Sequence, residues 1–198
     1  DKEDLVEVKN LIDSGINQDS LDHIDKITPQ IVKDATRKLN NEKSDPQFLF
    51  SSDCLKNAPD QLFEHMSQIF KIFLIHGHVS LFVLLSTMVP LIKDKLGNSC
   101  SSKNYRSIAI SSLLLKILDW VIIILFGDIL KLDELQFGYQ EGCSTTMASW
   151  IVLENISYFL RNGSEVFICL MDMTKAFDMV QHSVLFKKLL DKGLPYTV

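Results

Sequence analysis

The feature that most constrains the fold of this 198-residue chain is a short apolar run that ends in a carboxylate. Residues 167–171 read Phe-Ile-Cys-Leu-Met, and Asp172 follows them directly. A continuous apolar run of this length is typical of a strand that is covered on both faces. The pattern therefore predicts a central antiparallel strand over residues 166–171, with Asp172 at its exposed end.

A carboxylate in this position has two interpretations. Asp172 could cap the turn or helix that follows, since Asp is a common capping residue. Alternatively it could bind a metal, because a strand end holds a carboxylate rigidly and Mg²⁺ takes one or two such oxygens together with substrate phosphates. Taken alone, the residue favours the cap.

Helical periodicity and capping residues surround this run and two other short strand patterns. Thr28 before Pro29 is a typical helix start, Ser111 or Ser112 and Ser144 are candidate N-caps, and Gly77, Gly127 and Gly163 are plausible helix ends. The mixture of helices with short strands predicts an α+β fold. Helices are expected over residues 28–39, 60–77, 113–126, 145–162 and 183–192, and strands over 86–93 and 105–110 as well as 166–171.

The formal net charge of −5 is confined to one end of the chain. Residues 1–60 contain 13 acidic and 8 basic residues, whereas residues 61–198 contain 12 of each. Residues 1–27 are therefore expected to be an acidic linker. No strongly basic stretch stands out, which argues mildly against tight autonomous binding to a nucleic acid duplex.

Residues 72–92 contain no charged side chain and are long enough to span a bilayer as a helix. Gly77 between two histidines and Pro90 near the end favour a helix that stops at Gly77, followed by other buried structure, so no membrane partner is expected. The acidic first 20 residues lack the apolar core of a signal peptide. The four cysteines lack zinc-ligand spacing and fit reduced thiols, so an intracellular protein is expected, in the nucleus or the cytoplasm.

Four segments together resemble the reverse transcriptase domain of non-LTR (LINE-like, jockey-like) retrotransposons. The string "MDMTKAFDMVQHSVLFKKLLDKGL" (171–194) is similar to the family's first catalytic motif, in which a strand ends in Asp and Lys-Ala-Phe-Asp follows. "NYRSIAISSLLLKILD" (104–119) and "QFGYQEGCST" (136–145) resemble two fingers motifs, and "VPLIKDK" (89–95) lies where the family has a Pro-Lys segment. The four segments follow the family's order.

The resemblance implies the fingers and the first part of the palm of a right-hand polymerase. Residues 28–163 would be the fingers-like region and residues 164–198 an incomplete start of the palm. The activity of the intact parent would be RNA-directed DNA synthesis, with an RNA template, a DNA primer, deoxynucleoside triphosphates and Mg²⁺. No obligate protein partner is implied.

The resemblance also assigns roles to individual residues. Asp172 matches the first carboxylate of the two-metal centre, and the carbonyl of Met173 would complete a metal's coordination shell. The peptide groups of Lys175 and Ala176 would face the triphosphate. Phe177 matches the residue beneath the incoming sugar, which excludes a ribose 2′-hydroxyl; the alternative for this side chain is ordinary core packing.

Lys93 and Arg106 match fingers residues that hold the phosphates of the nucleotide, a task that suits a guanidinium fork. As isolated residues they would be solvated surface charges. Asp178 has no metal role in the family and is expected to make a structural hydrogen bond.

The chain also departs from the family. Ser107 replaces a Pro, and Gln140, Glu141 and Cys143 replace basic residues of the second fingers motif. No Asp-Asp pair occurs in the sequence, so the later palm motif is absent. We therefore expect a fragment that is inactive alone; the alternative is a non-catalytic remnant that at most binds nucleic acid.

Overall fold

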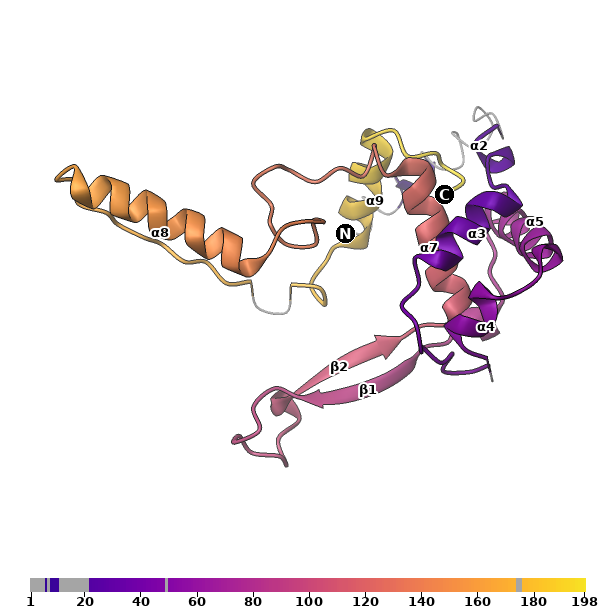
Figure 1. Ribbon diagram of the computed structural model, residues 1–198, viewed down its shortest axis with the longest axis horizontal. Helices are drawn as coiled ribbons and strands as arrows, with labels where there is room; N and C mark the ends of the chain where they lie inside the picture. The colour runs from indigo at the N-terminus through magenta and orange to yellow at the C-terminus, as the bar shows by residue number, and fades with distance from the viewer. Residues whose placement is uncertain (1–5, 7, 11–21, 49, 174–175) are drawn as a thin grey trace.

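The computed structural model describes residues 6, 8–10, 22–48, 50–173 and 176–198, and Figure 1 shows how its elements are arranged. Helices and one antiparallel sheet in the described part of the chain confirm the predicted α+β class. In chain order the elements are α2 (Asp22–Asp25), α3 (Pro29–Arg37), α4 (Ser52–Lys56), α5 (Asp60–His76), α6 (Leu81–Leu84), β1 (Thr87–Ile92), the 3₁₀ helix η1 (Ser102–Asn104), β2 (Tyr105–Ile110), α7 (Leu113–Phe126), α8 (Thr145–Arg161) and α9 (His182–Asp191).

The hydrophobic core lies where α3, α5 and α7 pack together (Figure 1). Each helix contributes a stripe of side chains spaced three or four residues apart, as an amphipathic helix must in order to bury one face. The apolar periodicity of the sequence therefore placed the core helices correctly. The buried stripes are Val32 and Ala35 in α3 with Leu39 just after it, then Phe63, Met66 and Phe70 in α5, and Leu113, Ile117 and Val121 in α7.

The predicted helix caps are present. The hydroxyl of Thr28 accepts a hydrogen bond from the N–H of Ile31 at 3.3 Å, and Ser144 accepts one from Met147 at 3.2 Å. Gly77 follows α5 with φ of 58°, a left-handed conformation that glycine adopts without a steric penalty. These sequence predictions are confirmed.

The uncharged run over residues 72–92 is divided among three elements. α5 ends at His76, α6 follows after a short connection, and β1 takes the rest of the run. The alternative of a single membrane-spanning helix in this segment is therefore wrong. Within the described ranges, no helix has both the length and the apolar character needed to cross a bilayer.

A buried carboxylate joins the loop after α3 to the start of α7. Asp45 is 7% exposed, and its Oδ2 accepts a hydrogen bond from the backbone N–H of Leu113 at 2.7 Å. Its Oδ1 accepts from the N–H groups of Gln47 and Phe48, both at 2.9 Å. One side chain thus shapes its own loop and caps a helix 68 residues further along the chain.

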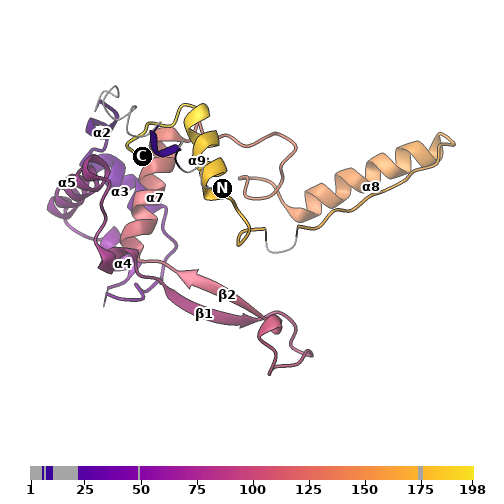
Figure 2. The ribbon, with the colours of Figure 1, turned by 180° about the vertical axis from the view of Figure 1, so that it is seen from behind.

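The predicted central strand over residues 166–171 is wrong. Residues 164–173 belong to no helix or strand, and Phe167, Leu170 and Met171 are about nine-tenths exposed. Figures 1 and 2 show this segment running back along α8, which projects from the helical core and buries none of its side chains. A strand needs a neighbour to pair its backbone groups, and β1 and β2 pair with each other instead.

We predict that Asp45→Ala lowers the free energy of unfolding by about 2–4 kcal/mol, because three backbone N–H groups lose a charged acceptor. Urea unfolding followed by circular dichroism measures the change. Asp128→Asn is the control, since Asp128 is 95% exposed. Equal stability of the two variants would contradict a structural role for Asp45.

A second prediction concerns Asp119 in α7, whose pKa is raised by partial burial. A raised pKa means that the folded protein holds this proton more tightly than the unfolded chain, so ionisation of Asp119 costs stability above the folded pKa. The cost disappears as the pH falls through the folded pKa toward the unfolded value. Asp119→Asn should therefore stabilise the protein at neutral pH, with a gain that shrinks toward zero near about pH 4.

Urea unfolding at neutral pH and at about pH 4 tests this pH dependence. The matched control is Asp191→Asn, at an exposed position. If the increase in the free energy of unfolding caused by Asp119→Asn became larger as the pH fell, burial would not penalise the Asp119 carboxylate.

Candidate functional site

The β1–β2 hairpin brings two of the predicted site residues onto one face. Leu91 pairs with Arg106 in the antiparallel ladder, and the N–H of Lys93 donates to the carbonyl of Asn104 at 2.8 Å, which extends the ladder beyond β1. Side chains alternate along a strand, and directly opposite residues share a face. Lys93 and Arg106 are therefore diagonal neighbours on the same face of the hairpin.

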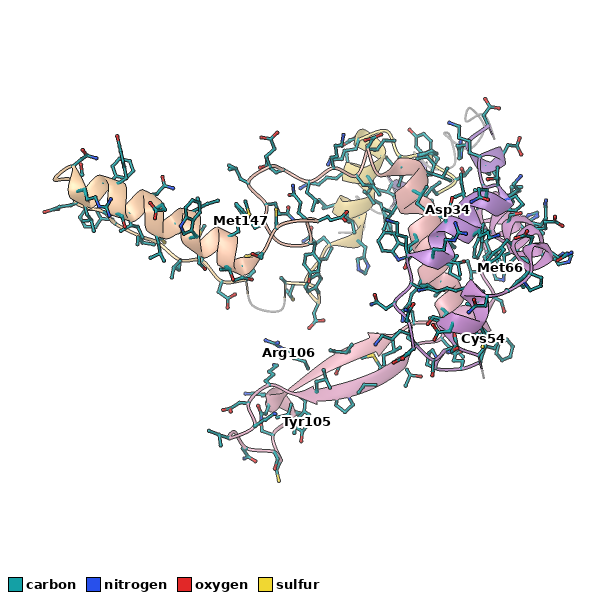
Figure 3. All side chains as sticks on the ribbon, viewed as in Figure 1. Asp34, Cys54, Met66, Tyr105, Arg106 and Met147 are labelled. Carbon is teal, nitrogen blue, oxygen red and sulfur yellow. The ribbon has the colours of Figure 1, made fainter. Side chains whose placement is uncertain are left out.

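The two cations differ in how they are held. Nζ of Lys93 donates a hydrogen bond to the carbonyl of Lys103 at 3.0 Å, which fixes its side chain near the hairpin end. The guanidinium of Arg106 makes no hydrogen bond or ion pair with another described residue. Figure 3 shows Arg106 and Tyr105 leaving β2 on opposite sides. Arg106 is thus the better placed of the two cations for an anionic ligand.

Asn104 and Tyr105 shape the loop that joins the strands. The side-chain amide of Asn104 donates to the carbonyl of Asp94 at 2.9 Å and accepts from its N–H at 3.0 Å. The hydroxyl of Tyr105 donates to the carbonyl of Ser99 at 2.9 Å. A Cβ on Gly97 would lie 3.0 Å from the Asn104 amide nitrogen, so the loop passes close to this side chain. In the "NYR" segment, therefore, Asn and Tyr hold the loop and Arg remains available.

The hairpin is basic, although the chain as a whole is acidic. Residues 87–110 contain one acidic residue, Asp94, and four basic residues, which are Lys93, Lys95, Lys103 and Arg106. Sequence reasoning over long segments missed this concentration, because it averaged the hairpin with the rest of residues 61–198. The signal that could have found it is the charge pattern: the residues directly before Lys93 and directly after Arg106 are uncharged, so the charged residues of this region gather in the hairpin.

Asp172 lies in the extended segment after α8. Its carboxylate is exposed and makes no hydrogen bond or ion pair with another described residue. The described part of the chain contains no group of three or more His, Cys, Asp and Glu side chains that could hold a metal ion. The described residues therefore offer Mg²⁺ one carboxylate at this position and not a complete site.

The neighbours of Asp172 are also exposed. Met173 is 78% exposed and Ala176 lies in a turn. Lys175 lies outside the described residues. Asp178 makes no hydrogen bond with another described residue, so the structural hydrogen bond expected for it is not found there.

Phe177 is placed by a contact with the segment before α8. Its ring meets that of Tyr139 edge to face, with centroids 5.9 Å apart and planes at 87°, a favoured aromatic geometry. Phe177 is 74% exposed, so the core-packing alternative is wrong. Tyr139 has a φ of 61°, unusual for a residue other than glycine. Two of the four segments that carry the resemblance are thus in contact.

The predicted site residues therefore form two separate groups. Lys93 and Arg106 share the hairpin, and Phe177 packs on Tyr139 close in sequence to Asp172. No hydrogen bond or ion pair joins Asp172 to either cation, and Figures 1 and 2 show the hairpin and the α8 arm leaving the helical core separately. The resemblance implies that Arg106 and Lys93 approach Asp172 across the nucleotide phosphates, and no contact between described residues tests this expectation.

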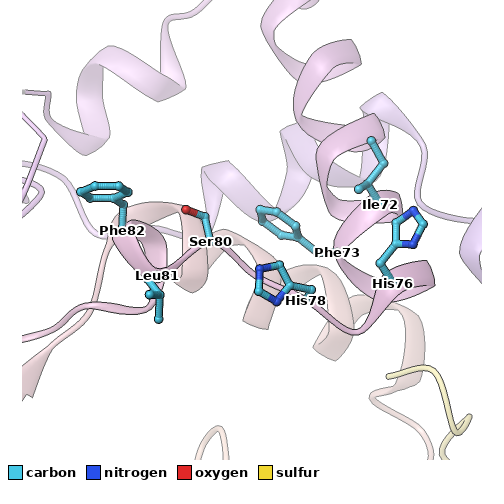
Figure 4. Close-up of a pocket in the computed structure, with 7 residues that line it drawn as sticks. All are labelled: Ile72, Phe73, His76, His78, Ser80, Leu81 and Phe82. Carbon is cyan, nitrogen blue, oxygen red and sulfur yellow. The ribbon is translucent and has the colours of Figure 1, made fainter.

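An open apolar hollow of about 540 Å³ lies between the end of α5 and α6 (Figure 4). Phe73, Leu81 and Phe82 contribute apolar walls, and the imidazoles of His76 and His78 lie at its edge. None of the residues predicted from the sequence lines this hollow.

No protein-family model matches the chain, and comparisons with curated proteins and with solved structures find no significant match either.

We predict that Asn104→Ala loosens the hairpin loop without unfolding the core, because its amide holds both backbone groups of Asp94. Amide hydrogen exchange over residues 94–103 should become faster, while the unfolding midpoint of the helical core changes little. Ser102→Ala, an exposed position in the same loop, is the control. Unchanged exchange in Asn104→Ala would show that the loop does not depend on this side chain.

Proposed function

We propose that this chain is part of an RNA-directed DNA polymerase of the non-LTR retrotransposon type. In the intact parent, the reaction is template-directed transfer of a nucleotide onto a DNA primer. The observation that carries the proposal is the set of four motif-like segments in the family's order between residues 89 and 194. One such segment would carry little weight, whereas four in order are specific.

The hairpin geometry supports this proposal. Lys93 and Arg106 come from two different motif-like segments, and the β1–β2 register puts them on one face. A polymerase fingers region needs cations that meet the phosphates of the incoming nucleotide together, and an arginine can bind such oxygens through two parallel N–H groups. The absence of a competing carboxylate on Arg106 among the described residues leaves it available for this task.

The aromatic contact between Tyr139 and Phe177 gives independent support. It joins the second fingers-like segment to the segment that contains Asp172. In the proposed role, Phe177 would lie under the sugar of the incoming nucleotide and exclude a 2′-hydroxyl. Its exposure is compatible with that role, because a side chain that touches substrate cannot be sealed in the core.

The proposed Mg²⁺ ligands are Asp172 and the carbonyl of Met173. A hard oxygen donor with no other partner suits Mg²⁺, but the described residues supply a single carboxylate there. When bound, the metal pair would hold the triphosphate and activate the primer hydroxyl. The chain's own contribution is to position one carboxylate, with the peptide groups of Lys175 and Ala176 proposed to face the phosphates.

The second candidate is a non-catalytic remnant that binds nucleic acid at most. It rests on the hairpin, whose cations can bind phosphates without any chemical step. Both candidates predict binding through the hairpin and no DNA synthesis by this chain alone, because two-metal transfer needs carboxylates on both sides of the ion pair and this sequence contains no Asp-Asp pair. They differ in whether the intact parent synthesises DNA.

Binding of an RNA–DNA hybrid, followed by fluorescence anisotropy at two salt concentrations, tests what both candidates share. Arg106→Ala should weaken binding about tenfold and reduce the salt slope by about one, since one phosphate contact is lost. Arg161→Ala, which removes the same charge from the end of α8, is the matched control. Absence of binding, or equal loss in both variants, would contradict a nucleic-acid role for the hairpin.

We further predict that the chain alone does not synthesise DNA in a primer-extension assay with an RNA template, deoxynucleoside triphosphates and Mg²⁺. One carboxylate cannot hold two metals about 3.5–4 Å apart, and losing that charge stabilisation removes the largest catalytic contribution. DNA synthesis by the wild-type chain that is lost in Asp172→Ala would overturn this prediction and support an active polymerase.

A further inference from the structure

A second basic feature lies on the helical core, on elements that do not carry the proposed polymerase residues. A hollow of about 310 Å³ opens between the end of α3 and the first half of α7. Three lysines from three different segments line it, namely Lys38 after α3, Lys43 in the following loop and Lys116 in α7. Their convergence is a product of the fold, because the sequence separates them by up to 78 positions.

These three ammonium groups have no carboxylate partner among the described residues. Other lysines of the same helical region do have one: Lys33 pairs with Asp60 at 2.6 Å and Lys71 with Asp25 at 3.6 Å. Three like charges that line one hollow with a single carboxylate, Asp119, leave an excess of positive charge there, and a bound anion relieves the repulsion between the lysines. The hollow therefore has the charge arrangement of an anion site.

The walls of the hollow are held in place by the core. Leu39 and Leu113 are buried beneath it, and the Leu113 N–H is already bonded to Asp45. An anion would consequently be held by side chains and not by the start of α7.

The remaining lining residues indicate the size and character of the ligand. Asn40 offers an amide donor, and the half-buried Trp120 offers an apolar wall. The volume of about 310 Å³ is at the lower end of the range for small-molecule sites. Asp119 is the single carboxylate among the described lining residues and opposes an anion.

We propose that this hollow binds a phosphate group, held by Lys38, Lys43, Lys116 and the amide of Asn40. The phosphate can come from a small free anion or from the backbone of a nucleic acid strand, since both present the same oxygens to the lysines. The proposal does not rest on the proposed polymerase function: Lys116 lies in the 104–119 segment, but none of these residues is among those given a role in polymerisation.

Calorimetric titration with inorganic pyrophosphate tests the site directly. Lys116→Gln should weaken binding at least about fivefold, as expected for the loss of one charged hydrogen bond. Lys188→Gln, which removes the same charge from an exposed position of α9 outside both the hollow and the hairpin, should bind like the wild type. Asp119→Asn should bind more tightly, because it removes the opposing charge.

A second variant keeps the test valid if Lys116→Gln folds poorly. The exposed pair Lys38→Gln/Lys43→Gln should also weaken pyrophosphate binding while its circular dichroism matches the wild type. Equal binding by these variants and by Lys188→Gln, or no binding by the wild type, would overturn the proposal.

The two phosphate sources are distinguished by competition. If the backbone of a strand is the source, a fluorescent single-stranded oligonucleotide should bind, should be displaced by pyrophosphate, and should lose affinity in Lys116→Gln but not in Lys188→Gln. If the source is a free anion, pyrophosphate should bind with the same dependence on Lys116 and the oligonucleotide should show none.

Discussion

The buried carboxylate of Asp45 is the interaction on which the arrangement of the described elements depends. It caps α7, the helix that packs against α3 in the core, and it shapes the loop that follows α3. Ser112, the residue before α7, also donates to the carbonyl of Val83 in α6, which precedes β1. The start of α7 is thus fixed to two distant segments. Because β2 ends two residues before α7, the same contacts determine where the hairpin leaves the core.

This arrangement explains why the two proposed ligand-binding regions differ in character. The α3–α7 hollow stands on buried residues, so its lysines converge on a rigid base. The hairpin is supported by its own ladder and by the Asn104 and Tyr105 hydrogen bonds, and so presents Arg106 beyond the core. α8 and residues 164–173 have even less support, since α8 buries none of its side chains. The proposed catalytic carboxylate therefore lies in the least packed of these regions.

The large exposed apolar surface of α8 and of the segment after it follows from the same difference. Trp150, Leu153, Phe167 and Leu170 are all more than half exposed. Apolar side chains in such number are normally covered in a folded protein.

Local sequence determined the elements whose signals are themselves local. Helix ends were specified by contacts within a few residues, at Thr28 with Pro29, Ser112, Ser144 and Gly77. The three- and four-residue spacing of apolar side chains selected the buried faces of α3, α5 and α7. The two strand patterns beside Lys93 and Arg106 were also found, because each run is short and bounded by polar residues.

Tertiary structure alone decided what depends on a partner distant in sequence. Residues 166–171 have the pattern of a strand, yet a strand exists only where a neighbour pairs its backbone, and none of the described residues does so. Conversely, Asp45, Lys38, Lys43 and Lys116 acquire their roles from residues that are distant in the sequence and that the fold brings close. Nothing near Asp45, Lys38 or Lys43 in the sequence marks them out, and only the packing of α3 against α7 gives Asp45 a helix to cap and brings the three lysines to one hollow.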